Sequence, residues 1–378
     1  MLASLLRNLM HRPSVAPPRA ASAPREFVDG VLQEFLLKAH EGVADNYDPV
    51  RFGFDGVDRS RQFDVGRHAA YLQFFIENAA AFRDAWQALE DEPSRQLFRR
   101  LILYRMLGHL HVAIRPGTGW TAEEALYAKA KAYERGESRL GVHGMFGPIR
   151  HYTDVPAAHG TLALDCWAGN VVYTTMKRQY FLARDGLDIG ARPGDVVLDA
   201  GACFGDTAVY FANVVGESGR VHAFDPLAAH QAVIDFNVAQ NALQSRVVAV
   251  PLAVGERSSA HTASRPAASD GVAQPGFSLH ATSADIPLIS IDDYARREKL
   301  ERVDFIKMDI EGYELAALKG ARETLARCRP TLAISLYHRP QDFFEIPLWL
   351  KGNFPWYQLH LDHYTIFHEE TVLFARAG

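Results

Sequence analysis

Residues 196–212 read VVLDAGACFGDTAVYFA, which is an apolar run, a turn with two glycines and then a helical run. A strand, a tight turn and a helix in this order form a ligand crevice at the carboxyl end of the strand. Gly201 allows the backbone to approach a ligand closely, and Gly205 permits tight packing of the helix on the strand. Many α/β turns carry two glycines for structural reasons alone, so a ligand site needs support from the residues around the turn.

Short Val-, Ile- and Leu-rich runs alternate with helical stretches after Gly194, a pattern typical of a parallel sheet with crossover helices. Five runs are strand candidates: VVLDAG (196–201), VHAFDP (221–226), VVAVPLAV (247–254), VDFIKMDIEG (303–312) and TLAISLY (331–337). The late runs YQLHL (357–361) and TVLFARA (371–377) suit an antiparallel pair at the edge of the sheet. The sequence therefore predicts an α/β fold with a Rossmann-like, mostly parallel sheet and an antiparallel C-terminal hairpin.

The chain before this sheet has a different composition. Residues 1–25 contain four arginines and four prolines but no acidic residue, and they predict a flexible basic tail. Residues 26–150 carry apolar side chains mostly at helical spacing and predict a helical N-terminal domain. Residues 151–190 are expected to hold connecting strands, with apolar runs near 161–164 and 171–174. The same region is expected to contain a segment that closes over the ligand. Residues 191–378 are expected to form the domain that binds this ligand.

Charge and cysteine content exclude several classes of protein. The formal charge of -5 lacks the basic excess of a protein that binds nucleic acid through its phosphates. Three cysteines without a CxxC pair predict neither a disulfide framework nor a structural zinc site, so a reducing, cytoplasmic location is expected. No run approaches the roughly 20 apolar residues of a membrane span. The polar stretch at 256–285 predicts a long, mobile loop.

Acidic residues around the glycine turn indicate a cationic ligand. Asp199 precedes the turn and Asp206 begins the helix, so negative charge surrounds the place where a pyrophosphate would lie. The GxGxxG fingerprint of dinucleotide sites is also missing, which argues against an NAD-linked oxidoreductase. Asp225 and Pro226 end the next strand, where a carboxylate can accept both hydroxyls of a ribose. S-adenosylmethionine is a ribosylated cation without phosphate, and it fits this pattern.

At this point residues 179–378 resemble the class I S-adenosylmethionine-dependent methyltransferases, and more closely their FkbM-type family. The motifs that carry the resemblance are RQYFL, GDVVLDAGACFGDTA, HAFDP, FIKMDIEGYELAALKGA, LAISLYHRPQDFFEIPLWL, HYT and ETVLFA. Cys203 stands where many class I enzymes have a glycine, and Asp225 stands where glutamate is common. The resemblance implies S-adenosylmethionine as the methyl donor, bound by Tyr180, Asp199, Gly201, Ala202, Gly205, Asp206, Thr207, Asp225, Pro226 and Asp309.

Methyl transfer to a hydroxyl needs an in-line approach of the acceptor and a base. Asp309 and Glu311 end the fourth strand candidate and His338 follows the fifth, so the three side chains should meet at the carboxyl edge of the sheet. Because a neutral imidazole takes a proton at neutral pH better than an ionised carboxylate does, His338 is the expected general base. As alternatives, Asp309 could cap a helix, His338 could be a loop histidine, or the three could bind Mg²⁺.

The predicted reaction is O-methylation of a hydroxyl on a sugar or other natural product, with a small molecule or glycan as the acceptor. N- or C-methylation and a non-catalytic, methyltransferase-like binding protein remain open. Gln179 and Tyr180 are expected in the segment that closes over the methionine part of the cofactor. The helical N-terminal domain is expected to form the acceptor pocket or a homodimer contact. The pairs His360/His363 and His109/His111 are interpreted as structural rather than metal-binding.

Overall fold

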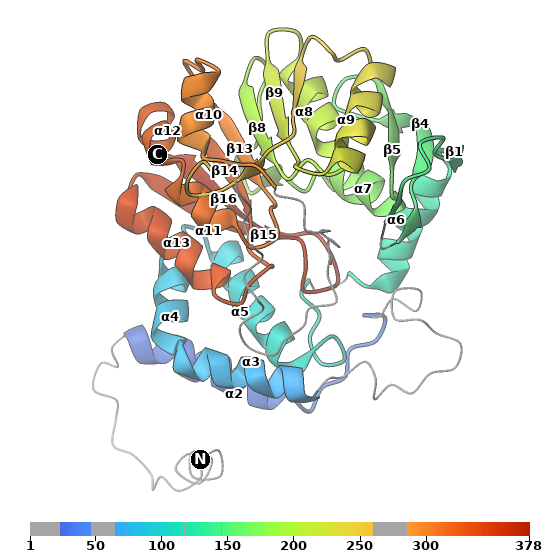
Figure 1. Ribbon diagram of the computed structural model, residues 1–378. Coiled ribbons are helices and arrows are strands. Elements are labelled where there is room, and N and C mark those ends of the chain that lie inside the picture. The colour runs from blue at the N-terminus through green and yellow to red at the C-terminus, as the bar shows by residue number, and fades with distance from the viewer. Residues whose placement is uncertain (1–22, 47–64, 116–117, 145, 260–285) are drawn as a thin grey trace, which may run out of the picture.

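The computed structural model describes residues 23–46, 65–115, 118–144, 146–259 and 286–378 (Figure 1). Most of the predicted basic tail and nearly all of the predicted loop at 256–285 lie outside these residues. Within the described part of the chain, every helix is too short or too polar to cross a membrane.

A seven-stranded sheet forms the centre of the fold, with the strand order β10-β9-β8-β13-β14-β16-β15. Its five parallel strands are β8 (Val196–Ala200), β9 (Arg220–Phe224), β10 (Val247–Val250), β13 (Phe305–Met308) and β14 (Thr331–Ser335). Two antiparallel strands, β15 (Tyr357–His363) and β16 (Thr371–Ala377), complete the edge. The predicted α/β class, the parallel strands and the C-terminal hairpin are confirmed.

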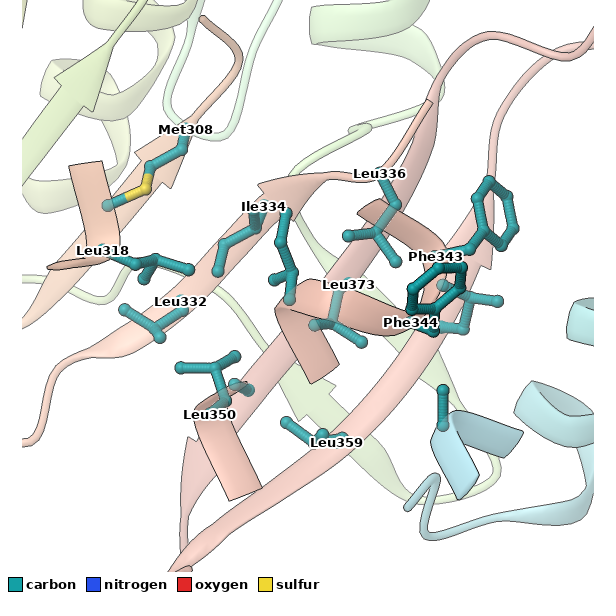
Figure 2. Close-up of a cluster of buried hydrophobic side chains, with 14 of the residues drawn as sticks. Met308, Leu318, Leu332, Ile334, Leu336, Phe343, Phe344, Leu350, Leu359 and Leu373 are labelled. Atoms are coloured by element: carbon teal, nitrogen blue, oxygen red, sulfur yellow. The ribbon is translucent and has the colours of Figure 1, made fainter. Parts of the chain in front are cut away.

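Successive side chains of the strands enter two different hydrophobic cores, as the pleat requires. In β14, Leu332 and Ile334 belong to one core and Ala333 to the other. Figure 2 shows Leu332 and Ile334 clustered with Phe343 and Leu350 of α13 (Asp342–Asn353). The opposite core contains the crossover helix α8 (Asp206–Val215). Both faces are therefore covered, which explains why these strands read as continuous apolar runs.

The remaining crossover helices lie on the two faces of the sheet (Figure 1). Their bounds are α9 (Ala228–Gln240), α10 (Ile291–Arg297), α11 (Glu314–Lys319) and α12 (Arg322–Cys328). A short parallel pair, β11 (Ala253–Val254) and β12 (Leu288–Ile289), stands apart from the main sheet.

The N-terminal helices share one hydrophobic core with the sheet rather than forming a core of their own. They are α2 (Ala23–Lys38), α3 (Val65–Glu77), α4 (Ala79–Gln87) and α5 (Glu92–Leu107). Phe82 of α4 packs edge-on against Phe344 of α13, with the ring centroids 5.1 Å apart, and Phe98 of α5 lies 5.7 Å from Phe343. Asp91 caps α5 and also bonds to His360 on β15, which fixes the helices beside the C-terminal strands.

Residues 120–144 and 146–189 form several small helices and sheets outside the main sheet. Their elements are α6 (Trp120–Lys131), β1 (Glu134–Glu137), β2 (His143–Gly144), β3 (Gly147–Pro148), β4 (Arg150–Pro156), β5 (Thr161–Cys166), α7 (Ala168–Asn170), η2 (Val171–Met176), β6 (Leu182–Arg184) and β7 (Leu187–Ile189). The strand expected near 161–164 is present. The strand expected near 171–174 is wrong: this run forms the π-helix η2, whose wide turn lets Thr174 reach Asp206 on α8.

Candidate active site

The glycine turn packs directly against the end of the neighbouring strand. Gly201 has φ +85°, and a Cβ at this position would overlap the carbonyl oxygen of Asp309. Gly205 has φ +78° immediately before α8 and lies against Ile234 of α9. Cys203, which stands where class I enzymes often have glycine, also has a positive φ of 49°. Gly201 thus allows the turn after β8 to approach the end of β13, and Gly205 allows the start of α8 to pack closely on α9.

A buried ion pair lies under this turn. Lys307 of β13 is in register with Asp199 of β8, and its Nζ lies 3.1 Å from the Asp199 carboxylate and donates to the carbonyl of Gly201 at 2.6 Å. Burial alone would lower the pKa of Lys307, but Asp199 and Asp309 outweigh burial, so the pKa is raised. Thr207 donates to the other oxygen of Asp199 at 2.6 Å. Lys307 is therefore a fixed cation at neutral pH.

A cavity of about 100 Å³ opens beside the ion pair. It is lined by Asn170, Tyr173, Thr174, Gln179, Tyr180, Gly201, Ala202, Cys203, Asp206, Thr207, Lys307, Asp309 and Glu370. Asp206 accepts from Asn170 at 3.2 Å and from Thr174 at 2.5 Å, and burial raises the pKa of Asp206 to about 6. Carboxylates from three separate elements thus face a space that also holds one lysine.

Asp225 occupies the predicted ribose position at the end of β9. One of its oxygens accepts from the amide of Cys203 at 3.1 Å and pairs with Nδ1 of His230 at 3.0 Å. The other oxygen accepts from the amide of Leu227 at 2.9 Å. Pro226 follows Asp225 but does not line the cavity described above. The carboxylate is therefore held in place beside the glycine turn.

Asp309 lines the cavity and is surrounded by polar side chains. It accepts from the hydroxyl of Tyr180 at 2.8 Å and from the hydroxyl of Tyr337 at 2.9 Å, and Nε2 of His338 lies 3.3 Å away. Burial by itself raises the pKa of Asp309, but His338, Lys307 and the two tyrosines outweigh it, so the pKa is lowered. Asp309 is therefore an ionised carboxylate. Tyr313, and not Asp309, is the N-cap residue of α11.

Three carboxylates surround His338. Its Nδ1 lies 2.9 Å from Glu314, and its Nε2 lies 3.8 Å from Glu311 in addition to Asp309. Burial lowers the pKa of His338, but the charge of Glu314 and then those of Asp309 and Glu311 raise it to about 10. The imidazole is therefore protonated at neutral pH, and the neutral base expected from the sequence is not the state that this geometry favours.

The three residues that could bind a metal ion differ in one member from the three expected from the sequence. Asp309, Glu314 and His338 each offer a ligand atom within 4.8 Å of the others. Glu311, the third ligand expected from the sequence, is about half exposed and has φ +57°. Glu314 is fully buried on α11 and accepts from the amide of Ile310 at 2.8 Å.

Seven residues of the site were not expected from the sequence, and they are Asn170, Tyr173, Thr174, Lys307, Glu314, Tyr337 and Glu370. Lys307 could have been predicted from the sequence, because a lysine inside the apolar run FIKMD can be buried only with a charged partner. Glu370 also begins the motif ETVLFA. Gln179 and Tyr180, which were expected to close over the cofactor, both line the cavity.

The histidine pairs outside the site have internal partners. His360 bonds to Asp91, and Nδ1 of His363 lies 2.9 Å from the hydroxyl of Thr371. Burial lowers the pKa of His363 to about 3 and that of His109 to about 4. These contacts support a structural role for them.

Comparison with known families identifies the domain that holds this site. Residues 199–365 match the model of the Methyltransferase FkbM domain. This part of the chain is therefore similar to an FkbM methyltransferase domain. The family uses S-adenosylmethionine, and the FkbM domain includes the glycine turn, Asp225, Lys307, Asp309 and His338. No curated protein matches the sequence.

Solved structures resemble the FkbM domain and its surroundings. Methyltransferase FkbM from Methylobacillus flagellatus is 21% identical, with a TM-score of 0.50 over 80% of this chain and 60% of that chain. The chain thus spans 60% of the length of that protein, and the likeness supports the fold. The O-methyltransferase from Bacillus cereus in complex with S-adenosylhomocysteine is 13% identical, with a TM-score of 0.33 over 70% of this chain and 93% of that one. Fibrillarin from Aeropyrum pernix with bound S-adenosylmethionine is 12% identical, with a TM-score of 0.37 over 61% and 90%.

Proposed function

We propose that this protein transfers a methyl group from S-adenosylmethionine to a hydroxyl of a sugar or other natural product, whether a small molecule or a glycan. The observation that carries the proposal is the cavity between the glycine turn and Asp309, which is lined by carboxylates and lies partly within the residues that match the FkbM domain. Such a lining suits a cationic ligand, because carboxylates favour a positive charge in a partly buried site.

The residues present fit the parts of the cofactor. Asp206 and Asp309 offer carboxylates to the ammonium group, Glu370 offers one to the sulfonium group, and Lys307 offers a cation to a carboxylate. Asp225 accepts from the amide of Cys203, which lines the cavity, and it would accept the ribose hydroxyls after its local bonds rearrange. When bound, the cofactor supplies an electrophilic methyl group.

Asp309 and His338 would orient the acceptor hydroxyl. Tyr180 and Tyr337 hold the two oxygens of Asp309 in fixed directions, so little reorganisation is needed when the acceptor binds. His338, held by Glu314, contributes a charged donor at neutral pH, and it would act as a base only after losing its proton. We retain Glu311 as an acceptor contact because it is exposed beside them.

The N-terminal helices are proposed to border the acceptor pocket or to form a homodimer contact. Arg105 of α5 donates to the carbonyls of Tyr337 at 3.4 Å and His368 at 3.3 Å, which brings α5 beside the active edge of the sheet. A cytoplasmic location is part of the same proposal, supported by three cysteines without disulfides.

The test is a mass-spectrometric screen of purified protein with methyl-labelled S-adenosylmethionine and a panel of hydroxylated sugars and natural products. The expected result is one labelled methyl group on a hydroxyl of at least one acceptor. Gly201→Val is the inactive control, because the added side chain would overlap the backbone of Asp309. Transfer only to nitrogen or carbon acceptors would contradict the proposal.

A metal-assisted version of the reaction is the second candidate, favoured by the proximity of Asp309, Glu314 and His338. A divalent ion there would lower the pKa of an acceptor hydroxyl. Chelation decides between the two versions: activity that survives EDTA supports the metal-free reaction, and activity restored by Mg²⁺ after chelation supports the metal.

A further inference from the structure

Glu370 reaches the cavity from a part of the chain that is distant in sequence from the glycine turn. It directly precedes β16, which runs antiparallel to β14, so it lies at the carboxyl edge of the parallel strands. It lines the same cavity as Gly201 and Asp309. Its backbone has φ +66°, a conformation that is uncommon for residues other than glycine and is concentrated at functional sites.

Hydrogen bonds fix Glu370 relative to Asp309. The side-chain amide nitrogen of Gln179 donates to Oε2 of Glu370 and lies 3.1 Å from the hydroxyl of Tyr180. This hydroxyl in turn donates to Asp309 at 2.8 Å. Among the described residues, none donates a hydrogen bond to Oε1 of Glu370. Oε1 is therefore the oxygen that remains for a ligand in the cavity.

Three ionisable groups at the site, Asp309, His338 and Glu370, differ in proton affinity. The pKa of Asp309 is lowered, and that of His338 is raised to about 10. Burial, followed by the charges of Asp309 and Glu369, raises the pKa of Glu370 to about 8. General base catalysis is most efficient when the pKa of the base lies near the operating pH. Glu370 meets this condition better than Asp309 or His338. Asp206 also lines the cavity and has a pKa of about 6. Both of its oxygens accept hydrogen bonds, from Asn170 and Thr174, whereas among the described residues only Oε2 of Glu370 does so.

We propose that Glu370 is the general base for the acceptor hydroxyl, an inference that rests on the proposed O-methyl transfer. In this step the hydroxyl oxygen forms a bond to the methyl carbon, and the bond between that carbon and sulfur breaks with its electrons remaining on sulfur. The hydroxyl proton moves to Oε1 of Glu370. Glu370 changes from carboxylate to carboxylic acid as the sulfonium charge disappears, so the net charge of the cavity is unchanged.

This charge balance couples the protonation of Glu370 to the cofactor. A cation in the cavity favours the ionised form of a nearby carboxyl group, so Glu370 should lose its proton when S-adenosylmethionine binds. S-adenosylhomocysteine lacks the methyl group and its charge, so it should leave Glu370 protonated. The titratable groups around Glu370 are Tyr173, Lys177, Tyr180, Cys203, Asp206, Lys307, Asp309, Tyr337, His338 and Glu369.

The first test measures proton release by titration calorimetry at pH 7 in buffers of different ionisation enthalpy. For the wild-type protein we expect S-adenosylmethionine to release at least about half a proton more than S-adenosylhomocysteine, because a group with a pKa near 8 is mostly protonated at this pH. Glu370→Gln should abolish that difference. Glu345→Gln, which removes an α13 carboxylate paired with Arg339 outside the cavity, should retain it.

The second test measures turnover and cofactor affinity together. Glu370→Gln should lower kcat roughly 10²–10⁴-fold, the usual contribution of a general base, and remove the acidic limb of the pH–rate profile. Its dissociation constant for S-adenosylhomocysteine should change less than about threefold, because this ligand leaves the carboxyl neutral. Glu370→Asp should recover part of the lost turnover, and circular dichroism checks that both variants fold.

Three results would overturn the inference. One is a kcat of Glu370→Gln within about threefold of the wild type, where a base contributes at least 10². Another is a proton-release difference that persists in this variant, and a third is a loss of cofactor affinity with normal kcat at saturation. If the wild-type protein binds neither sulfur compound, the proposed function itself fails, and that outcome is distinct from binding without the predicted proton release.

Discussion

Replacing Lys307 by methionine removes the cation under the glycine turn. Lys307 and Asp199 are 1% and 0% exposed, and their charged groups lie 3.1 Å apart. Methionine has a similar length and adapts to irregular packing, so little cavity is created. The dominant effect is the buried charge left on Asp199, because removing one member of a buried ion pair costs about 3–5 kcal/mol.

We therefore expect Lys307→Met to lower the free energy of unfolding by about 3–5 kcal/mol. The assay is urea unfolding followed by circular dichroism, with Lys129→Met on the exposed surface of α6 as the matched control. The double variant Lys307→Met with Asp199→Asn should be more stable than the single variant, because the uncompensated charge is gone. Cofactor affinity should fall in both variants.

The reasoning is refuted if Lys307→Met loses less than about 1 kcal/mol, the range of an exposed ion pair. It is also refuted if adding Asp199→Asn to Lys307→Met lowers the free energy of unfolding by as much as Asp199→Asn does alone. Effects that add in this way indicate that the two sites are independent.

Three other predictions concern the site and its charges. Asp225→Ala should weaken binding of S-adenosylhomocysteine by about 1.5–3 kcal/mol, the loss expected for hydrogen bonds to a charged group, and unchanged affinity in calorimetry would mean that the ribose is held elsewhere. His338 has its pKa raised from 6.5 to about 10, so its contribution to stability is complete below pH 6.5 and is lost as pH rises through 10. Denaturation midpoints between these pH values should fall for the wild type and fall less for His338→Gln. Phe82→Ala should cost about 3–5 kcal/mol of unfolding free energy, and a cost below about 1 kcal/mol would show that α4 does not share the core of the sheet.

The sheet could be predicted from the sequence because its strands are buried on both faces. Each such strand appears in the sequence as a continuous apolar run. Each parallel strand coincides with one of the Val-, Ile- and Leu-rich runs, and the turn after β8 is marked by Gly201 and Gly205. The run at 171–174 has the same β-branched composition but forms η2. Its contacts with α6 and α8 decide its conformation, and composition does not record them.

The candidate site could be predicted only where residues follow a strand at the carboxyl edge. Asp199, Asp225, Asp309 and His338 were found by this rule. The protonation states of these residues could not be predicted, because they depend on residues that folding brings together. Glu314 lies on α11 and determines the charge of His338, although its position in the sequence indicates an ordinary helix residue.

The central claim is that the cavity beside the glycine turn binds S-adenosylmethionine, and calorimetric titration tests it most directly. The wild-type protein should bind both S-adenosylmethionine and S-adenosylhomocysteine at a single site per chain, and it should not respond to NAD. Gly201→Val should abolish binding, because its side chain would overlap the backbone of Asp309, and circular dichroism checks that this variant folds. Binding of NAD without a response to either sulfur compound, or full binding by Gly201→Val, would contradict the account.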